Sequence, residues 1–270
     1  MKLSTSFFAL FTFAAAGAAN ATLVTAQDNF DKGQAGMGWA DTWKLIEGTQ
    51  KNPAPAAFAN SSLVFTGNNN NAAVRKLADT QRSDVFVNFT LSYQGVLGNN
   101  DFVGLWFGDS TSTDFGKDVD HTKGPNIGLK ANCGDAKLTT TCTNITNDLF
   151  VRTTGSGGYA LVGSDLNSGF SYDVFGHLYK SGTNGSDYYD RFDAWFRNNE
   201  TGELSSIVTA SGKSNLTSID TLGFRSANID YNVSVSIDSL RISEVPEPGS
   251  LALMGLALAG LAATRRRPRG

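Results

Sequence analysis

The sequence contains few of the residues that most enzymes use for catalysis. It has only two histidines and two cysteines in 270 residues, and it has no G-x-S-x-G or C-x-x-C motif. Glycosidases need two carboxylates held close together, yet no Glu-x-Asp pair occurs. Between residues 22 and 244 the glutamates are limited to Glu47, Glu200, Glu203 and Glu244. These absences disfavour nucleophilic and paired-carboxylate catalysis, so we expect no catalytic residue and no enzymatic activity.

Clusters of basic residues are also missing before the last six residues. The chain has 22 Lys and Arg against 25 Asp and Glu; without Lys2 and the four arginines near the end, 17 basic residues remain, a net charge of about −8. An acidic surface argues against nucleic acid and anionic lipid as partners. It is compatible with neutral glycans or with cation-bridged acidic polysaccharide.

Proline is rare and long helical periods are missing, whereas Gly, Ser, Thr and Asn are abundant. This composition is typical of many strands joined by turns. Residues 85–93 alternate between apolar and polar side chains, and residues 102–107 are apolar on both faces, as in a central strand. Residues 231–237 alternate from Tyr231 onward, and the pattern shifts at Asp238, which predicts a bulge or a bend. We expect an all-β domain over residues 22–244, built as a two-sheet antiparallel β-sandwich.

The N-terminal residues 1–21 form a separate segment. Lys2 precedes a short apolar stretch that ends in a small-residue cleavage site, the pattern of a secretory signal peptide. We expect cleavage after Ala21, with Ala26 as the alternative.

The C-terminal residues 245–270 form a second segment with three parts. Its parts are the motif Pro246, Glu247 and Pro248, an apolar helix over 251–264, and a basic tail with Arg265, Arg266, Arg267 and Arg269. The apolar helix would reach only about 20 Å of a roughly 30 Å hydrocarbon core, so length alone makes a weak transmembrane prediction. A buried C-terminal helix is the alternative, but no charged face breaks the apolar run.

This tripartite tail resembles the PEP-CTERM sorting signal of exported Gram-negative proteins. The resemblance implies that a membrane-embedded exosortase recognises the motif and cuts there, in bacteria that make an exopolysaccharide (biofilm) matrix. The arginines agree with it, because a basic flank stays on the cytoplasmic side. We therefore expect a transient stay in the inner membrane, followed by release at the cell surface or outside the cell.

Several blocks of the middle region resemble a concanavalin A-like or LamG-like jelly roll. The blocks are Asp28–Asp31, Gly38–Trp39, Trp43, GLWFGD (104–109), PNIGLK (125–130), DLFVRT (148–153), GHLYK (176–180), YDRFDAWF (189–196) and VSIDSLRIS (235–243). The resemblance implies two packed sheets with the first and last strands adjacent, and it implies no particular ligand.

A glycan-binding patch is expected where aromatic side chains lie on a polar strand face. In a strand over about 188–197, Trp195 shares its face with Arg191 and Asp193. In a strand over about 171–180, His177 and Tyr179 share a face, and the two faces merge if the strands pair. The alternative is that these aromatic rings cover a second packed layer. The three remaining tryptophans, Trp39, Trp43 and Trp106, are expected in the core.

Two loops contain further candidate residues. Calcium prefers oxygen ligands, and an acidic stretch offers them in Asp109, Asp114, Asp118, Asp120 and Asn126. Legume-type lectins, which have the fold that the chain resembles, hold cations in a similarly placed loop, although the spacing differs and Asn126 stands where a histidine is expected. A solvated acidic loop is the alternative, and we expect no other cofactor. Cys133 and Cys142 are expected to form a disulfide in an oxidising compartment.

Together these features predict an exported, exosortase-processed surface protein whose β-sandwich associates with polysaccharide in the extracellular matrix without catalysis. A glycoside hydrolase or lyase acting on exopolysaccharide is one alternative. A structural matrix protein without a defined ligand is the other.

Overall fold

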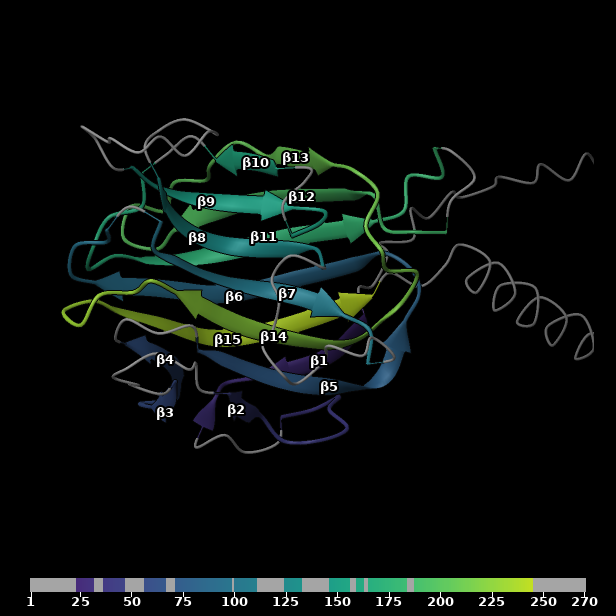
Figure 1. The fold of residues 1–270 in the computed structure, drawn as a ribbon, viewed down its shortest axis with the longest axis horizontal. Coiled ribbons are helices and arrows are strands. Elements are labelled where there is room, and N and C mark those ends of the chain that lie inside the picture. The colour runs from purple at the N-terminus through teal and green to yellow at the C-terminus, as the bar shows by residue number, and fades with distance from the viewer. Residues whose placement is uncertain are drawn as a thin grey trace, which may run out of the picture.

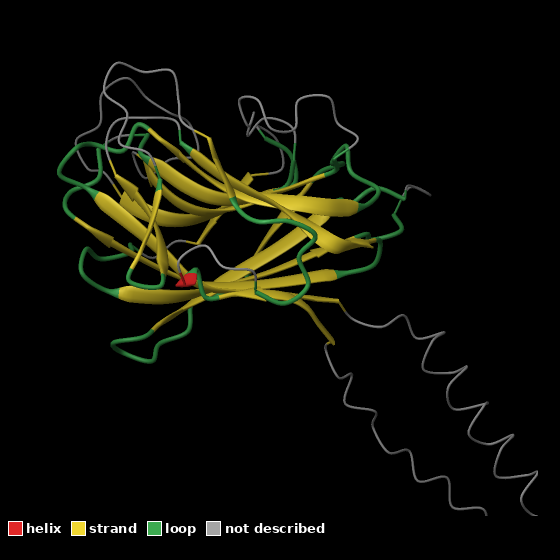
Figure 2. Cartoon of the chain, turned by 90° about the horizontal axis from the view of Figure 1, so that it is seen from below, coloured by secondary structure: helices red, strands yellow, loops and turns green. Residues whose placement is uncertain are grey.

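The structure is a computed structural model, and it describes residues 23–31, 36–46, 56–66, 71–98, 100–110, 124–132, 146–155, 159–162, 165–183 and 187–244. These residues form two antiparallel sheets that pack face to face (Figures 1 and 2). The predicted all-β sandwich is confirmed. No helix in the described part of the chain is both long and apolar enough to cross a membrane.

The eight-stranded sheet has the order β13-β12-β11-β6-β15-β4-β3, with β1 paired to β15 beside β4. Its strands are β1 (Leu23–Asp28), β3 (Ala57–Ala59), β4 (Ser62–Thr66), β6 (Val85–Gln94), β11 (Ser171–Tyr179), β12 (Arg191–Asn198), β13 (Val208–Ser211) and β15 (Ser234–Glu244). The first and last strands are therefore adjacent, as expected.

The seven-stranded sheet has the order β10-β9-β8-β7-β14-β5-β2. Its strands are β2 (Lys44–Ile46), β5 (Ala72–Gln81), β7 (Phe102–Gly108), β8 (Asn126–Asn132), β9 (Thr146–Arg152), β10 (Tyr159–Val162) and β14 (Ile219–Ala227). Every residue of β7 is buried, and β8 and β14 flank it, which confirms the predicted central strand.

The core lies between the sheets and follows from the alternation of each strand. In β6 the five apolar side chains at odd positions are at most 2% exposed, whereas those between them are partly exposed. Aromatic rings meet across the sandwich: Phe107 lies 5.8 Å from Phe192, and Phe89 lies 5.3 Å from Phe224. Each sheet therefore has two distinct faces: one is packed in the core, and the other is directed toward the solvent.

The bulge expected near Asp238 is present, because the β15–β6 register shifts between Asp238 and Arg241. Ser239 has a φ of 54°, in the left-handed region. The expectation that Tyr231 begins the alternating strand is wrong. The backbone NH of Val233 donates to the carbonyl of Asp230 and closes a turn, so Tyr231 is 65% exposed and β15 begins at Ser234.

The three tryptophans expected in the core differ in their burial and packing. Trp43 lies in the core, as predicted. Trp106 is buried, but it packs outside the main core against Ala72 and Val74. Trp39 is only partly buried, so that expectation is wrong for it.

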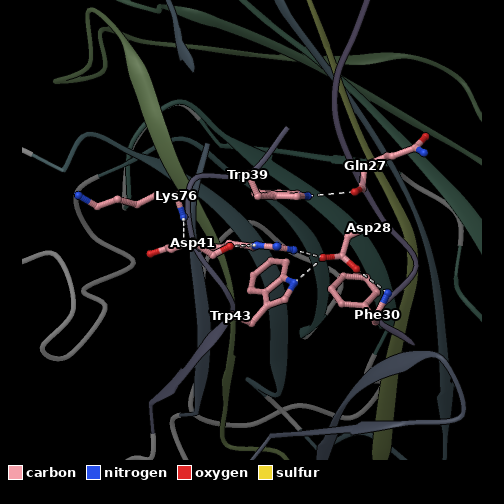
Figure 3. A network of polar contacts seen from close by, with 8 residues as sticks. Gln27, Asp28, Phe30, Trp39, Asp41, Trp43 and Lys76 are labelled. Carbon is pink, nitrogen blue, oxygen red and sulfur yellow. Dashed lines mark hydrogen bonds and ion pairs between the residues drawn. The ribbon is translucent and has the colours of Figure 1, made fainter. Parts of the chain in front are cut away.

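A buried polar network ties the two sheets together near β1 (Figure 3). Asp28 accepts hydrogen bonds from the backbone NH of Phe30 (2.7 Å) and from Trp43 Nε1 (2.8 Å), and it forms an ion pair with Arg75. The Arg75 guanidinium lies 4.5 Å from the centre of the Trp39 ring, and Trp39 Nε1 donates to the carbonyl of Gln27. Because Asp28 is in β1 and Arg75 in β5, this network links the eight-stranded sheet to the seven-stranded sheet.

Candidate functional site

The candidate site lies on the outer face of the eight-stranded sheet, where β12, β11, β6 and β15 lie side by side. In β11 and β12, alternate residues such as Val174, Leu178 and Phe192 are buried in the core. The residues between them therefore point outward, as the alternation of the sequence predicts. Strand pairing sets Phe175 opposite Trp195 and His177 opposite Asp193.

Two aromatic stacks cross this face. The rings of Phe175 and Trp195 lie 5.5 Å apart with planes 12° from parallel. The His177 ring lies 4.1 Å from Phe86 and 4.5 Å from Tyr179, nearly parallel to both. We call these five side chains the aromatic face. All five are partly exposed, so their ring surfaces meet the solvent.

A shallow groove of about 260 Å³ lies within the aromatic face. It is lined by Phe86, Val87, Asn88, Phe175, Gly176, Trp195, Arg241 and Ser243. Gly176 lies in the core-facing phase of β11, and a Cβ there would meet core side chains, 2.8 Å from Phe192 Cε2 and 2.9 Å from Val87 Cγ1. The groove thus combines aromatic rings with an amide, a hydroxyl and a guanidinium. Flat apolar surface beside polar hydrogen-bonding groups is the arrangement that small polar ligands need.

Polar side chains border the aromatic face. His177 Nε2 lies 3.1 Å from Asp84 Oδ2, and its Nδ1 lies 3.8 Å from Asp193 Oδ2. Asp193 also accepts a hydrogen bond from Thr209 Oγ1 at 2.6 Å. Partial burial raises the pKa of Tyr179, and the negative charge of Asp193 adds to this shift. Tyr179 therefore stays a neutral hydrogen-bond donor at physiological pH.

A second polar cluster borders the Trp195 end of the face. Asp173 Oδ2 accepts from Arg197 Nη2 at 2.5 Å, and its Oδ1 accepts from Thr90 Oγ1 at 2.9 Å. Burial works to raise the pKa of Asp173, but hydrogen bonds from Asn199, Thr90 and Arg197 outweigh it, so the pKa is lowered. This carboxylate remains ionised and links β6, β11 and β12.

The structure brings the residues predicted from sequence together: Trp195, His177, Tyr179, Arg191 and Asp193 all lie on this one face. Sequence reasoning missed the groove residues Phe86, Asn88 and Arg241. A signal for Phe86 was present, because it is an apolar residue in the polar phase of β6. Arg241 gave no signal, because its place beside Asn88 depends on the pairing of β15 with β6.

Comparison with known proteins identifies the tail. Residues 244–267 match the PEP-CTERM protein-sorting motif. Such a motif indicates export across the membrane and processing by exosortase. None of the curated proteins matches the chain by sequence similarity.

Comparison of folds identifies the sandwich. The exoplasmic/lumenal domain of VIP36, in a metal-free form, has a TM-score of 0.53 at 12% identity, covering 83% of this chain and 92% of that one. Lectin II from Ulex europaeus has a TM-score of 0.50 at 11% identity, covering 75% and 98%. Lectin UEA-II complexed with galactose has a TM-score of 0.50 at 10% identity, covering 74% of this chain and 98% of that one. The chain carries a PEP-CTERM sorting motif and a lectin-like β-sandwich.

The predicted calcium loop of this lectin-like sandwich is described only at its ends. Asp109 follows β7 and accepts a hydrogen bond from Ser218 Oγ at 3.3 Å. Asn126, at the start of β8, is 1% exposed; its Nδ2 donates to the carbonyl of Gly124, while its Oδ1 has no hydrogen-bond partner among the described residues. Among the described residues, no three His, Cys, Asp or Glu side chains gather closely enough to hold a metal ion. Asp114, Asp118 and Asp120 lie outside those residues, so the calcium site stays a prediction.

Several other predictions concern residues that the structure does not describe. These are the signal peptide over 1–21, the sorting motif Pro246–Pro248, the apolar helix over 251–264, the basic tail over 265–270, and the disulfide between Cys133 and Cys142. Of these, the family match covers the sorting motif and most of the tail. The signal peptide, the membrane-spanning role of residues 251–264 and the disulfide stay predictions.

Proposed function

We propose that this protein is exported by a Gram-negative bacterium, cut by exosortase at its tail, and then associates with polysaccharide of the extracellular matrix without catalysis. The aromatic face is the binding surface in this proposal. Its support is a single observation: five partly exposed aromatic side chains lie on an otherwise polar sheet face, and three of them, Phe86, Phe175 and Trp195, line a groove. Aromatic side chains that stay exposed to solvent on a sheet face can stack on the apolar face of a sugar ring.

The groove fits one ring-sized group of a longer chain. Its volume of about 260 Å³ is below the roughly 300 Å³ at which enclosed small-molecule sites begin. Asn88, Ser243 and Arg241 supply hydrogen-bonding groups beside the aromatic wall. We therefore infer surface association with a polymer, in which many weak contacts add up.

Two measurements on the purified protein test this proposal. Binding is measured on a glycan array that includes the host's own exopolysaccharide, with and without calcium. Release of reducing ends from the same exopolysaccharide is measured in parallel. The proposal predicts retention without release of reducing ends. Reducing-end release would favour a hydrolase, and absence of retention under both conditions would favour a structural protein without a defined ligand.

A further inference from the structure

A second cavity lies on the outer face of the other sheet, away from the aromatic face. Its volume is about 210 Å³, and we call it the basic cavity. It is lined by Asn100, Phe102, Lys130, Arg152, Arg225, Ala227 and Asn228. Phe102 pairs with Lys130 on one side and with Ala227 on the other, so three adjacent strands of the seven-stranded sheet form its floor.

Three cationic side chains line this cavity, and no acidic residue is among the described residues that line it. Lys130 and Arg225 are each only 8% exposed. Asp148, on β9, is in register with Lys130 and brings one carboxylate near the cavity. The described lining is therefore rich in positive charge, which attracts an anionic ligand.

Two of these cations donate a hydrogen bond to a neutral oxygen. Lys130 Nζ donates to Asn100 Oδ1 at 2.7 Å, and Arg152 Nη1 donates to the carbonyl of Gly155 at 2.8 Å. Burial lowers the pKa of Lys130 to about 8, and the positive charge of Arg152 adds to this shift. An anion in the cavity would act in the opposite direction and raise this pKa.

An apolar surface lies beside the cations. The Phe102 and Phe150 rings are 5.3 Å apart, and the Arg152 guanidinium lies 5.1 Å above the Phe150 ring. Gly104 makes room for them, because a Cβ there would lie 3.0 Å from Phe150 Cζ. The cavity thus offers a ring surface and a cluster of charged donors to one ligand. Arginine is suited to a planar carboxylate, which it can hold through two parallel hydrogen bonds.

We propose that the basic cavity binds the carboxylate of an acidic sugar unit, with Arg152, Arg225 and Lys130 as the anion-binding residues and Phe102 as the surface for the sugar ring. The saccharide part of this assignment rests on the proposed function, because an exported matrix protein meets acid groups mainly on acidic polysaccharide. The site itself is independent of the aromatic face and lies on the other sheet. It gives a protein with an acidic overall charge a local means of holding an acidic polymer.

Calorimetric titration of the full chain, kept soluble in a sugar-free non-ionic detergent at constant ionic strength, tests the proposal. The probes are a galacturonic acid tetrasaccharide, a galactose tetrasaccharide and sodium acetate. We expect the acidic tetrasaccharide to bind more tightly than acetate, and Arg225→Gln to weaken its binding about tenfold or more. Arg82→Gln, which changes an exposed arginine outside the cavity, serves as the matched control and leaves the affinity unchanged.

A second readout needs no substitution. Because Lys130 has a pKa of about 8, binding of the acidic tetrasaccharide at pH 8 should take up as much as about half a proton, and almost none at pH 6.5. Titrations in two buffers of different ionisation enthalpy measure this uptake, and Lys130→Met abolishes it. Among the described residues, Arg152 and Arg225 line the cavity with Lys130, and Asp148 is in register with it on β9.

Three results would overturn the proposal. In the first, the acidic tetrasaccharide does not bind. In the second, Arg82→Gln and Arg225→Gln weaken its binding equally. In the third, its binding at pH 8 takes up no proton. Acetate binding as tightly as the tetrasaccharide would overturn the assignment to a saccharide. Trp195→Ala separates the two sites: it should leave binding of the acidic tetrasaccharide intact, whatever it does to retention on the host's exopolysaccharide.

Discussion

The indole of Trp195 faces the ring of Phe175 across the β11–β12 pair, with ring centres 5.5 Å apart and planes 12° from parallel. This contact lies on the outer face of the sheet, where Trp195 keeps part of its surface exposed. The stack holds the indole in place without burying it in the core. Trp195 is therefore a rigid platform whose loss is expected to affect binding more than folding.

Replacing Trp195 by Ala should lower the free energy of unfolding by only about 0.5–1.5 kcal/mol, the usual value of an aromatic pair. Trp43→Ala is the matched control: Trp43 is in the core, and its loss should cost roughly 3–5 kcal/mol. Urea unfolding followed by circular dichroism measures both. Equal costs for the two variants would mean that Trp195 belongs to the packed interior.

Replacing Asp28 by Asn should destabilise the protein by about 3–5 kcal/mol. The substitution keeps the size of the side chain but leaves the guanidinium of Arg75, which is 0% exposed, without its counter-charge. Lys44→Gln is the control, because it breaks an exposed ion pair with Asp41 and should cost less than about 1 kcal/mol. Similar unfolding midpoints for the two variants would contradict the role of this network in joining the sheets.

Asp101 should make stability depend on pH between about 4 and 6. It is 2% exposed, and burial raises its pKa to about 6; the negative charge of Asp230 adds to this, and a hydrogen bond from the Gly98 backbone NH opposes it. The folded protein thus binds this proton more tightly than the unfolded chain, whose carboxyl has a pKa near 3.8. The stabilising contribution is complete at low pH and is lost as pH rises through about 6.

Asp101→Asn should remove this dependence and raise the free energy of unfolding at pH 7 by at most about 3 kcal/mol. Urea titrations of both proteins at pH 4.5 and pH 7 measure the difference. Asp187→Asn, at an exposed position, is the control and should keep the wild-type dependence. An unchanged pH dependence in Asp101→Asn would show that this carboxyl ionises normally.

Processing of the tail is the most direct consequence of the sorting motif at residues 244–267. Mass spectrometry of the protein from its native host should show loss of the residues beyond Pro246–Pro248. A host strain that lacks exosortase should retain Arg265 and the residues after it. Full-length protein in exosortase-competent cells would contradict the assignment.

The sequence predicts the faces of single strands well and their order in the sheets poorly. The alternation in β6 follows from local periodicity, and so does the shared face of Arg191, Asp193 and Trp195. Tyr231 was misplaced because the same periodicity continues into a turn, where a backbone hydrogen bond between Val233 and Asp230 decides the conformation.

Sites assembled from distant strands are beyond such reasoning. The groove joins Phe86, Trp195 and Arg241, and the basic cavity joins Lys130, Arg152 and Arg225. In each case the residues lie far apart in sequence, and only the long-range pairing of strands brings them together. The buried pair of Asp28 and Arg75 has the same origin, since β1 and β5 belong to different sheets.

The central claim is that the aromatic face binds polysaccharide, and affinity electrophoresis tests it most directly. The purified protein, Trp195→Ala and Tyr231→Ala are run through gels with and without the host's exopolysaccharide. Tyr231 is the matched control, because it is an exposed aromatic residue in a turn outside the aromatic face. The account predicts that the polysaccharide retards the wild type and Tyr231→Ala alike, and that Trp195→Ala migrates almost as it does in the plain gel. Equal retardation of all three, or of none, would contradict it.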